Sequence, residues 1–266
     1  MTGTGDATAP AEDRPAAPAG RVADAGVPQD TGVLQDDQPG PPPQGGAWAV
    51  SRAVLNVTAG PLLDVRAAGV GHLDPGRGGL LLANHQSFLD PIVLGLRLDR
   101  SVTFLARDSL FRVPGFGRYL RAMKTLPIAR DAPATAVMRS ALAAMRRGEL
   151  VGLFPEGTRT RDGRMGELKP GFVTLTRRGD APVYPVGIAG TFEALPRTRT
   201  LPVPSPGRVR VVFGEPLGPA DVAAAGGTAG VVELVELRIA AAFAAASRWR
   251  ETGERSEFVD AGECRG

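Results

Sequence analysis

A histidine and an aspartate stand five positions apart in the segment Leu80–Pro91. The apolar run Leu80–Ala83 predicts a buried strand. Asp90-Pro91 predicts a helix start, because proline is preformed for the first helical position and Asp can cap the free N–H groups. The tight turn between these elements can fold the Asp90 carboxylate back onto the His85 ring. The carboxylate would then fix the tautomer of the ring and leave its other nitrogen free to take a proton from a hydroxyl.

Taken alone, this pair would be weak evidence, since a histidine near a strand end is usually structural and an Asp-Pro pair usually caps a helix. A second apolar strand, Leu150–Phe154, is predicted about seventy residues later and opens into the turn Pro155–Arg159. Here Gly157 would let backbone amides approach a ligand, and Arg159 supplies a fixed positive charge suited to a phosphate or an oxyanion. The alternative is that Glu156 and Arg159 form a local ion pair in the turn and bind no ligand. The two junctions together predict one shared site.

Two further segments could converge on the same cleft. Lys124–Arg130 is a strand-like apolar stretch that ends on a guanidinium, whose fork suits two phosphate oxygens. Taken alone, Arg130 would be interpreted as a solvated surface charge. Ala181–Val186 is a proline-flanked strand without a reactive group, and we expect it to form a wall of the site.

Length and composition favour one catalytic domain. The chain has 266 residues, of which 43% are hydrophobic and 22% charged, enough for one α/β core. Residues 1–46 are almost all Ala, Gly, Pro, Asp, Gln and Thr and offer almost no apolar periodicity, which predicts disorder. We therefore expect a disordered acidic segment at 1–46, the domain at 47–250 and a flexible tail at 251–266.

The charge is divided between these parts. Residues 1–46 carry two arginines against seven Asp and Glu, so the net +3 of the chain leaves residues 47–266 strongly basic. Phosphate, an anionic membrane or nucleic acid could each be the partner of such a domain. No recognisable nucleic-acid module is present, so nucleic acid is not expected as a partner.

The cysteine content, the histidine spacing and the hydropathy of the chain exclude several classes of protein. The single cysteine, Cys264, excludes an intrachain disulfide framework and a cysteine metal site, and it fits a reducing compartment. Neither of the two histidines, His72 and His85, has a partner at metal-ligand spacing, so we expect no metal or other cofactor. The N-terminus lacks the pattern of a secretory signal, and no stretch approaches 18 uninterrupted apolar residues. We expect no membrane-spanning helix.

From Trp48 onward, short apolar runs alternate with helical periods, which predicts an α/β layout. Strands are expected at Leu63–Val70, Leu80–Ala83, Val102–Leu105, Leu150–Phe154, Val183–Ile188 and Arg208–Phe213. Helices are expected near Pro91–Leu98, Phe116–Met123, Pro133–Arg147, Gly171–Arg178 and Val231–Arg250. In the last helix, apolar residues at Leu234, Leu237, Ala241 and Ala245 predict the face that docks on the sheet.

In this order, the four segments resemble the glycerolipid acyltransferase family that includes the 1-acyl-glycerol-3-phosphate acyltransferases. The motif Asn-His-x-Ser-x-x-Asp is matched at Asn84–Asp90, and the arginine that ends the family's second block falls on Arg130. The block Phe-Pro-Glu-Gly-Thr-Arg-Ser falls on Phe154–Arg159, with Thr160 in the last place, and the fourth block resembles Pro182–Val186. The resemblance spans about residues 63–215.

The resemblance implies a single α/β domain with a mixed, largely parallel sheet flanked by helices, as in glycerol-3-phosphate acyltransferases. It implies that His85, held by Asp90, deprotonates the free hydroxyl of lysophosphatidate, which then attacks the thioester of an acyl-CoA or acyl carrier protein to give phosphatidic acid. The acceptor's glycerol phosphate would be held by Arg130, Glu156, Gly157 and Arg159, with Arg107 and Lys169 as further cations. Another lysophospholipid, glycerol 3-phosphate or an aminolipid remains an alternative acceptor, and a catalytically silent lipid-binding protein is the alternative from another class.

Two features of the motifs need separate interpretation. Ser87 does not stand in the Gly-x-Ser-x-Gly elbow of serine hydrolases, so we expect it to support the turn. Many relatives begin with a hydrophobic helical hairpin, whereas here only Trp48–Val57 is available, and it contains Arg52. We expect peripheral contact with an anionic membrane, at the inner face of the plasma membrane of the cell. The segment Leu110–Arg121 interleaves Phe and Tyr with Arg and could make that contact, unless its rings are core residues.

Overall fold

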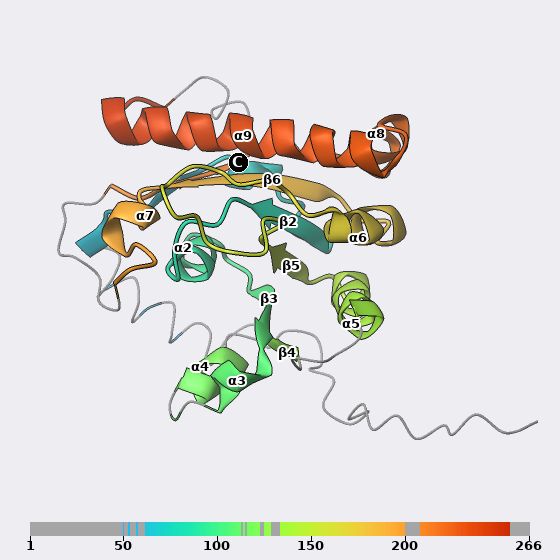
Figure 1. Cartoon of the computed structure of the whole chain (residues 1–266), viewed down its shortest axis with the longest axis horizontal. Helices are drawn as coiled ribbons and strands as arrows, with labels where there is room; N and C mark the ends of the chain where they lie inside the picture. The colour runs from blue at the N-terminus through green and yellow to red at the C-terminus, as the bar shows by residue number, and fades with distance from the viewer. Residues whose placement is uncertain are drawn as a thin grey trace, which may run out of the picture. The chain divides into compact units, whose positions relative to one another are not determined.

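A central sheet carries the chain's two motif turns. The computed structural model describes residues 50, 53, 57, 62–112, 114, 116–122, 125–128, 134–199 and 208–255, all within the unit 39–266. The described residues form a seven-stranded sheet with the order β1-β7-β6-β2-β5-β3-β4 (Figure 1). Its strands are β1 (Arg66–Ala68), β2 (Gly79–Ala83), β3 (Val102–Arg107), β4 (Leu126–Ile128), β5 (Leu150–Leu153), β6 (Val183–Ala189) and β7 (Arg210–Phe213).

The sheet is mixed and largely parallel, as expected. Strands β6, β2, β5, β3 and β4 run parallel to one another, whereas β7 is antiparallel to β6 and β1 is parallel to β7. The register places Leu82 of β2 between Leu153 of β5 and Pro185 of β6. The carboxyl ends of β2, β5 and β6 therefore meet at one edge, and both motif turns begin there.

A proline in the interior strand β6 is tolerated because of where β7 ends. Val186 pairs with Phe213, the last residue of β7, so Pro185 lies just beyond the paired stretch. Proline lacks the N–H that a central ladder position would need. The Pro185 carbonyl still accepts a hydrogen bond from Gly214 N at 2.8 Å. The proline-flanked strand predicted from the sequence is thus a wall of the domain, with every side chain buried.

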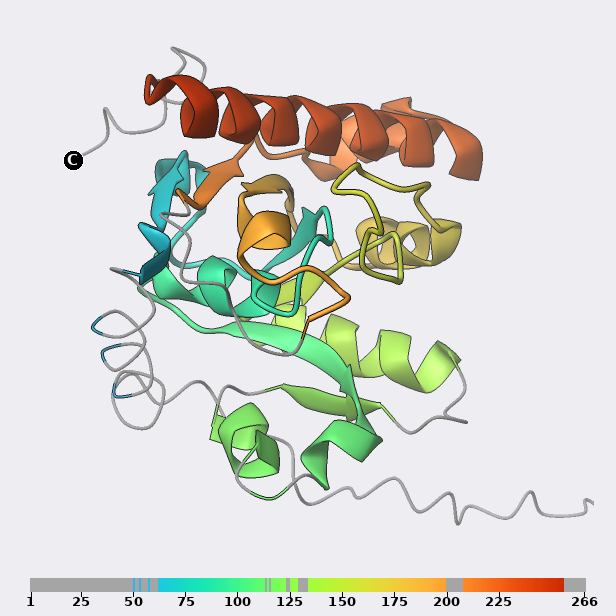
Figure 2. The same cartoon turned by 60° about the vertical axis from the view of Figure 1, so that its left-hand side comes forward.

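Helices cover both faces of the sheet. They are α2 (Asp90–Leu96), α3 (Asp108–Phe111), α4 (Phe116–Ala122), α5 (Ala134–Arg146), α6 (Val173–Arg178), α7 (Thr191–Ala194), α8 (Pro219–Ala224) and α9 (Thr228–Thr252), with short 3₁₀ turns at Val70–His72 and Pro170–Phe172. In β2, Leu81 and Ala83 pack with α2, whereas Leu80 and Leu82 pack with α5, α6 and α9. Figures 1 and 2 show α9 lying along the sheet, while α3 and α4 lie beyond the β3–β4 edge.

The face predicted for the last helix was half right: Ala245 is buried and Leu234 packs partly buried on the core, but the other two residues are exposed. Leu237 is 66% exposed and Ala241 is also exposed, whereas the buried stripe is Val231, Val235, Ile239, Ala242, Ala245, Ala246 and Trp249. The helix is apolar on several sides, so periodicity alone does not choose among them. The choice is made by a close approach to β6, where a Cβ added to Gly187 would lie 2.2 Å from backbone atoms of Ala242 and Phe243. Only glycine at position 187 leaves room for the backbone of α9 at this distance.

Most predicted elements are present, with shifted ends. The strand expected at Leu63–Val70 is limited to Arg66–Ala68, because Leu63 ends a helical turn and Asp64 has a positive φ of 38°. The short helices α3, α7 and α8 were not anticipated. The predicted segments 1–46 and most of 251–266 lie outside the described residues, so those domain boundaries stay predictions. No helix among the described residues is long and apolar enough to cross a bilayer.

Candidate active site

His85 and Asp90 are in contact just after the carboxyl end of β2. The Nδ1 atom of His85 lies 2.8 Å from Oδ2 of Asp90, and the same oxygen accepts the backbone N–H groups of Gln86 and Ser87 at 2.7 Å each. Because a backbone N–H can only donate, Oδ2 is an acceptor and the proton of the His85 contact lies on Nδ1. Nε2 is then the unprotonated nitrogen, and it makes no hydrogen bond within the described part of the chain.

The expectation that Asp90 caps its helix was wrong. Leu89 is the N-cap residue of α2, Asp90 is the first helical residue, and no side chain caps the helix. The Asp90 carboxylate instead turns back to the N–H groups of the preceding turn, where it is completely buried. The carboxylate binds three donors from this turn and none from the helix backbone, so it organises the turn rather than the helix.

The His85 ring is held against an aromatic side chain from the second junction. The rings of His85 and Phe154 are stacked, with centroids 4.1 Å apart and an interplanar angle of 16°. Phe104 of β3 continues the stack behind Phe154, at 6.0 Å and 7°. The His85 side chain is 17% exposed. One ring edge therefore faces Asp90, one face is covered by Phe154, and access to the free nitrogen remains.

Glu156 joins the two turns through the backbone. Its Oε1 accepts the N–H of His85 at 2.8 Å, and its Oε2 accepts the N–H of Gly166 at 2.9 Å. Thr160 N–H returns a hydrogen bond to the His85 carbonyl at 2.8 Å. Burial raises the pKa of Glu156 despite these two N–H donors, which act to lower it. Both carboxylate oxygens are thus used by the chain itself, so the alternative of a Glu156–Arg159 ion pair does not hold.

Arg159 has a buried N–H group that could donate a hydrogen bond to an anion. Its guanidinium carbon lies 3.5 Å from the centroid of the Phe88 ring, and Nη1 is buried with no hydrogen-bond partner among the residues that the structure describes. Partial burial and then the neighbouring charge of Arg197 lower the pKa of Arg159, while Asp90 acts in the opposite direction. A buried guanidinium donor of this kind is suited to a charge-assisted hydrogen bond with an anionic oxygen. An anion beside Arg159 would satisfy Nη1 and relieve the repulsion from Arg197.

The remaining predicted binding residues are placed unequally. Gly157 has a φ of +69°, and a Cβ added there would lie 3.0 Å from the ammonium nitrogen of Lys169. Lys169 therefore lies over the motif turn, and its role as a binding cation stays a prediction. Arg107 ends strand β3, which runs two residues longer than predicted, but its side chain lies outside the described part of the structure. Arg130 lies outside the described residues altogether.

Ser87 supports the turn. Its hydroxyl donates to the carbonyl of Leu195 at 2.8 Å and accepts the N–H of Leu89 at 3.2 Å, and the residue is completely buried. These bonds connect the turn after β2 to the end of α7. The hydroxyl is therefore engaged in structure, and the arrangement does not supply a nucleophile beside His85.

Sequence reasoning missed several residues around the pair. Phe88 is 58% exposed under Arg159, and Arg197 adds a second cation. Gln86 donates to the Gly163 carbonyl at 2.9 Å, and Thr191 donates to Oδ1 of Asp90 at 2.6 Å. The strand Val183–Ala189 carries no reactive group, as expected, but the threonine two residues beyond its end reaches the site. Its position after the carboxyl end of a neighbouring parallel strand was the available signal.

The structure describes only part of the basic aromatic segment Leu110–Arg121. Phe111 is half-buried, and the Arg121 guanidinium lies 5.7 Å from the centre of its ring. Leu120 of the same segment is buried. The side chain of Phe116 is outside the described part of the structure. Membrane contact through this segment therefore stays a prediction.

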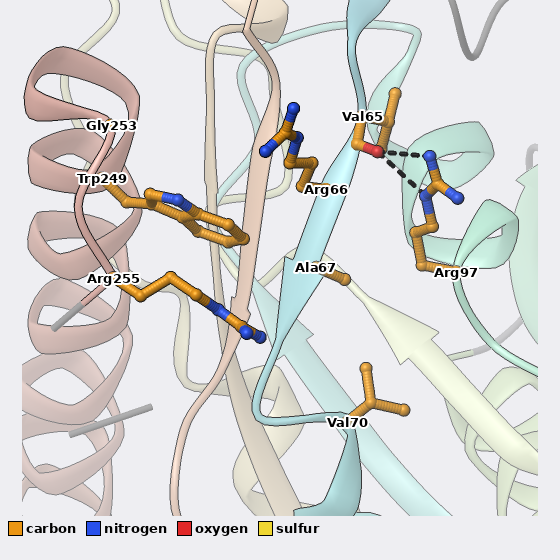
Figure 3. Close-up of a pocket in the computed structure, with 8 residues that line it drawn as sticks. All are labelled: Val65, Arg66, Ala67, Val70, Arg97, Trp249, Gly253 and Arg255. Carbon is orange, nitrogen blue, oxygen red and sulfur yellow. Dashed lines mark hydrogen bonds between the residues drawn. The ribbon is translucent and has the colours of Figure 1, made fainter. Parts of the chain in front are cut away.

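A pocket of about 560 Å³ lies elsewhere, at the β1 edge of the sheet. Figure 3 shows that the residues around it come from three places. Val65 and Arg66 lie at the start of β1, Arg97 follows α2, and Trp249 and Arg255 lie near the end of α9. Arg66 pairs with Asp64, and Arg97 donates to the Val65 carbonyl through both Nε and Nη2. None of the residues named for the His85 site lines this pocket, so it is not the site of the candidate chemistry.

The sequence of the chain is similar to that of known acyltransferases. The model of the family described as Acyltransferase matches residues 64–189. A 1-acyl-sn-glycerol-3-phosphate acyltransferase of Bacillus subtilis is 30% identical over 151 residues, covering 56% of this chain and 72% of that protein. The chloroplastic enzyme BAT2 of Brassica napus is 34% identical over 138 residues, which are 51% of this chain and 40% of that protein. The chain thus spans less than half the length of such plastid relatives.

The fold agrees as well. The crystal structure of the 1-acyl-sn-glycerophosphate acyltransferase PlsC from Thermotoga maritima aligns with a TM-score of 0.59 and 23% identity, over 77% of this chain and 78% of that one. At that identity the likeness concerns the fold. Together with the Bacillus relative and the family model, it shows that the chain belongs to the acyltransferase family that includes the 1-acyl-sn-glycerol-3-phosphate acyltransferases.

Proposed function

We propose that the protein transfers a fatty acyl group from an acyl thioester to the free hydroxyl of 1-acyl-glycerol 3-phosphate, giving phosphatidic acid. The observation that carries the proposal is the His85–Asp90 contact of 2.8 Å, which leaves Nε2 without a hydrogen bond among the described residues, as is the buried Nη1 of Arg159. A base alone would suit many reactions. A base and a cation in two adjoining turns suit a hydroxyl substrate that also carries a phosphate.

The residues divide the reaction between them. Nε2 of His85 takes the proton of the acceptor hydroxyl as its oxygen attacks the thioester carbonyl. Asp90 stabilises the resulting imidazolium through Nδ1. When the tetrahedral intermediate collapses, the C–S bond breaks and the imidazolium gives its proton to the departing thiolate. The products are the new ester and a free thiol, and no acyl-enzyme forms.

The acceptor's phosphate is assigned to the cations around the second turn. Arg159 offers the buried Nη1, Arg197 adds charge beside it, and Lys169 lies over Gly157. A guanidinium donates two parallel hydrogen bonds to phosphate oxygens, which makes it suitable for orienting the acceptor. The donor is an acyl-CoA or an acyl carrier protein, and we propose that the protein meets an anionic membrane peripherally, at the inner face of the plasma membrane.

The test is acyl transfer by purified protein supplied with lysophosphatidate and a long-chain acyl-CoA, followed through release of free CoA thiol. We expect release that needs the lysolipid and that is lost in His85→Ala. His72→Gln is the control, because His72 is the other histidine of the chain and contacts Phe213 and Glu215 away from the site. Retention of the lysolipid by His85→Ala would separate loss of chemistry from loss of binding.

Other outcomes identify the alternatives. Thiol release without lysolipid would indicate a thioesterase. No release under either condition calls for acyl carrier protein as donor and for glycerol 3-phosphate, other lysophospholipids or aminolipids as acceptors. Failure of every pair, with lysolipid still bound, would favour a catalytically silent lipid-binding protein.

A further inference from the structure

We propose that Thr191 is a positioning residue for the base, which acts by holding the second oxygen of Asp90. Its hydroxyl donates to Oδ1 of Asp90 at 2.6 Å, and both residues are completely buried. Thr191 lies at the start of α7, directly beyond β6, and is 101 positions from Asp90 in the chain. The inference rests on the proposed acyl transfer, since positioning matters only where His85 acts as a base.

The two oxygens of Asp90 are held very differently. Oδ2 accepts three hydrogen bonds, from His85, Gln86 and Ser87, all within the turn that immediately precedes it. Among the described residues, Oδ1 accepts only the hydroxyl of Thr191. Without that bond the carboxylate is anchored through one oxygen and can rotate about its Cβ–Cγ bond. Rotation would move Oδ2 relative to Nδ1, and the ring would lose its fixed orientation.

The hydroxyl proton of Thr191 is committed to Asp90. A second acceptor, Oε1 of Gln86, lies at 3.5 Å, the outer limit for a hydrogen bond. The 2.6 Å contact lies in the range of charge-assisted O–H···O⁻ bonds, about 2.5–2.7 Å, which are roughly twice as strong as neutral ones. Gln86 meanwhile donates to the Gly163 carbonyl, so its amide is already oriented by another loop. The Thr191 hydroxyl is therefore oriented to donate to Asp90 rather than to Gln86.

Burial makes the bond difficult to replace. Thr191 and Asp90 are both at 0% exposure, so bulk water does not reach Oδ1 when the hydroxyl is removed. A buried carboxylate oxygen without a donor is strongly disfavoured. The neighbouring charges do not substitute for it, since Glu156 is an anion bonded to His85 N–H and Gly166 N–H, and the Arg159 guanidinium is stacked on Phe88. The β branch of threonine further restricts its side-chain rotamer.

The experiment compares Thr191→Val, which keeps the shape and removes the hydroxyl, with Thr191→Ser, which keeps the hydroxyl. We expect kcat to fall roughly 10- to 100-fold in Thr191→Val, below the 10²- to 10⁴-fold typical of a whole general base, with KM for lysophosphatidate unchanged. Thr191→Ser should recover most of the rate. The control is Thr176→Val, which removes another buried threonine hydroxyl, bonded at 2.9 Å to the Val173 carbonyl of α6, and should leave kcat unchanged.

NMR spectroscopy tests the positioning role of Thr191 without any substrate. The chain has two histidines, so the ¹⁵N ring signals of His85 are identified by their loss in His85→Ala. We expect the Nδ1–H signal of His85 to shift or broaden in Thr191→Val and to stay in Thr191→Ser, with His72 unchanged. Thr191→Val that folds as the wild type and keeps both kcat and the Nδ1–H signal would overturn the proposal. If no acceptor is turned over by the wild type, the proposed function fails, and the His85 signal alone tests the positioning role.

Discussion

The guanidinium carbon of Arg159 lies over the ring of Phe88, 3.5 Å from its centroid, although Phe88 belongs to the turn after β2 and Arg159 to the turn after β5. Removing the ring in Phe88→Leu should leave Arg159 without its cation–π partner, an interaction of about 0.5–2 kcal/mol. We expect KM for lysophosphatidate to rise roughly 2- to 20-fold and kcat to change little. Steady-state kinetics with varied acceptor measures this. An unchanged KM would show that Arg159 is positioned without Phe88.

Arg197 should contribute to affinity for the phosphate of the acceptor. It is exposed, so its effect is screened by solvent and salt, and we expect Arg197→Ala to raise the acceptor KM about 2- to 5-fold at low ionic strength. The exposed Arg199, two residues later, provides the control substitution Arg199→Ala. The KM effect should shrink as salt is raised. An equal effect of both variants would indicate general surface charge rather than a cation of the site.

Asn84 should be a stability residue of the site. Its side chain donates to the Ile188 carbonyl at 2.9 Å and accepts the Ile188 N–H at 2.7 Å, so it pairs β2 with β6 beyond the last residues of the ladder. Asn84→Ala leaves both buried backbone groups unpaired, which we expect to lower the free energy of unfolding by about 2–4 kcal/mol. Thermal unfolding followed by circular dichroism measures the loss. Asn84→Asp keeps the acceptor for the Ile188 N–H but places a buried carboxylate oxygen against the Ile188 carbonyl, so we expect a loss at least as large as in Asn84→Ala.

Glu156 should give the protein a distinctive dependence on pH. Burial raises its pKa above the ordinary value of 4.5, so between these two values the folded state binds more protons than the unfolded state. Its contribution to the free energy of unfolding is therefore full below pH 4.5, falls as pH rises through the raised pKa, and is constant above it. Denaturant unfolding at a series of pH values should show this decline in the wild type. Glu156→Gln cannot titrate at this position, so its free energy of unfolding should not show the decline. A decline of the same size in Glu156→Gln would show that another group causes it.

Acyl transfer should not depend on a metal ion. Within the described residues, no group of three His, Cys, Asp or Glu side chains is arranged to hold one. We expect the rate to be unchanged after dialysis against a chelator. Loss of activity that one specific cation restores would contradict this prediction, whereas restoration by any divalent cation would indicate an effect on the lipid substrate.

The sequence by itself determined the parts of this protein that depend on neighbours in the chain. Asn84–Asp90 and Phe154–Arg159 each follow an apolar strand, and those local patterns were enough to predict a histidine with its orienting carboxylate and a turn carrying a cation. The α/β layout followed from the same alternation of apolar runs and helical periods. Parallel strands bring their carboxyl ends to one edge, so local motifs implied a shared site.

Only the tertiary structure decided which groups meet across long separations. Thr191, Arg197 and the ring of Phe88 carry no motif of their own, and their roles come from the register of β6 beside β2 and from the stacking on Arg159. The buried face of α9 was set in the same way, by the space beside Gly187 and not by hydrophobic period. Periodicity records which residues can be buried, whereas packing selects which of them are. A contact between residues a hundred positions apart exists only once the sheet has formed.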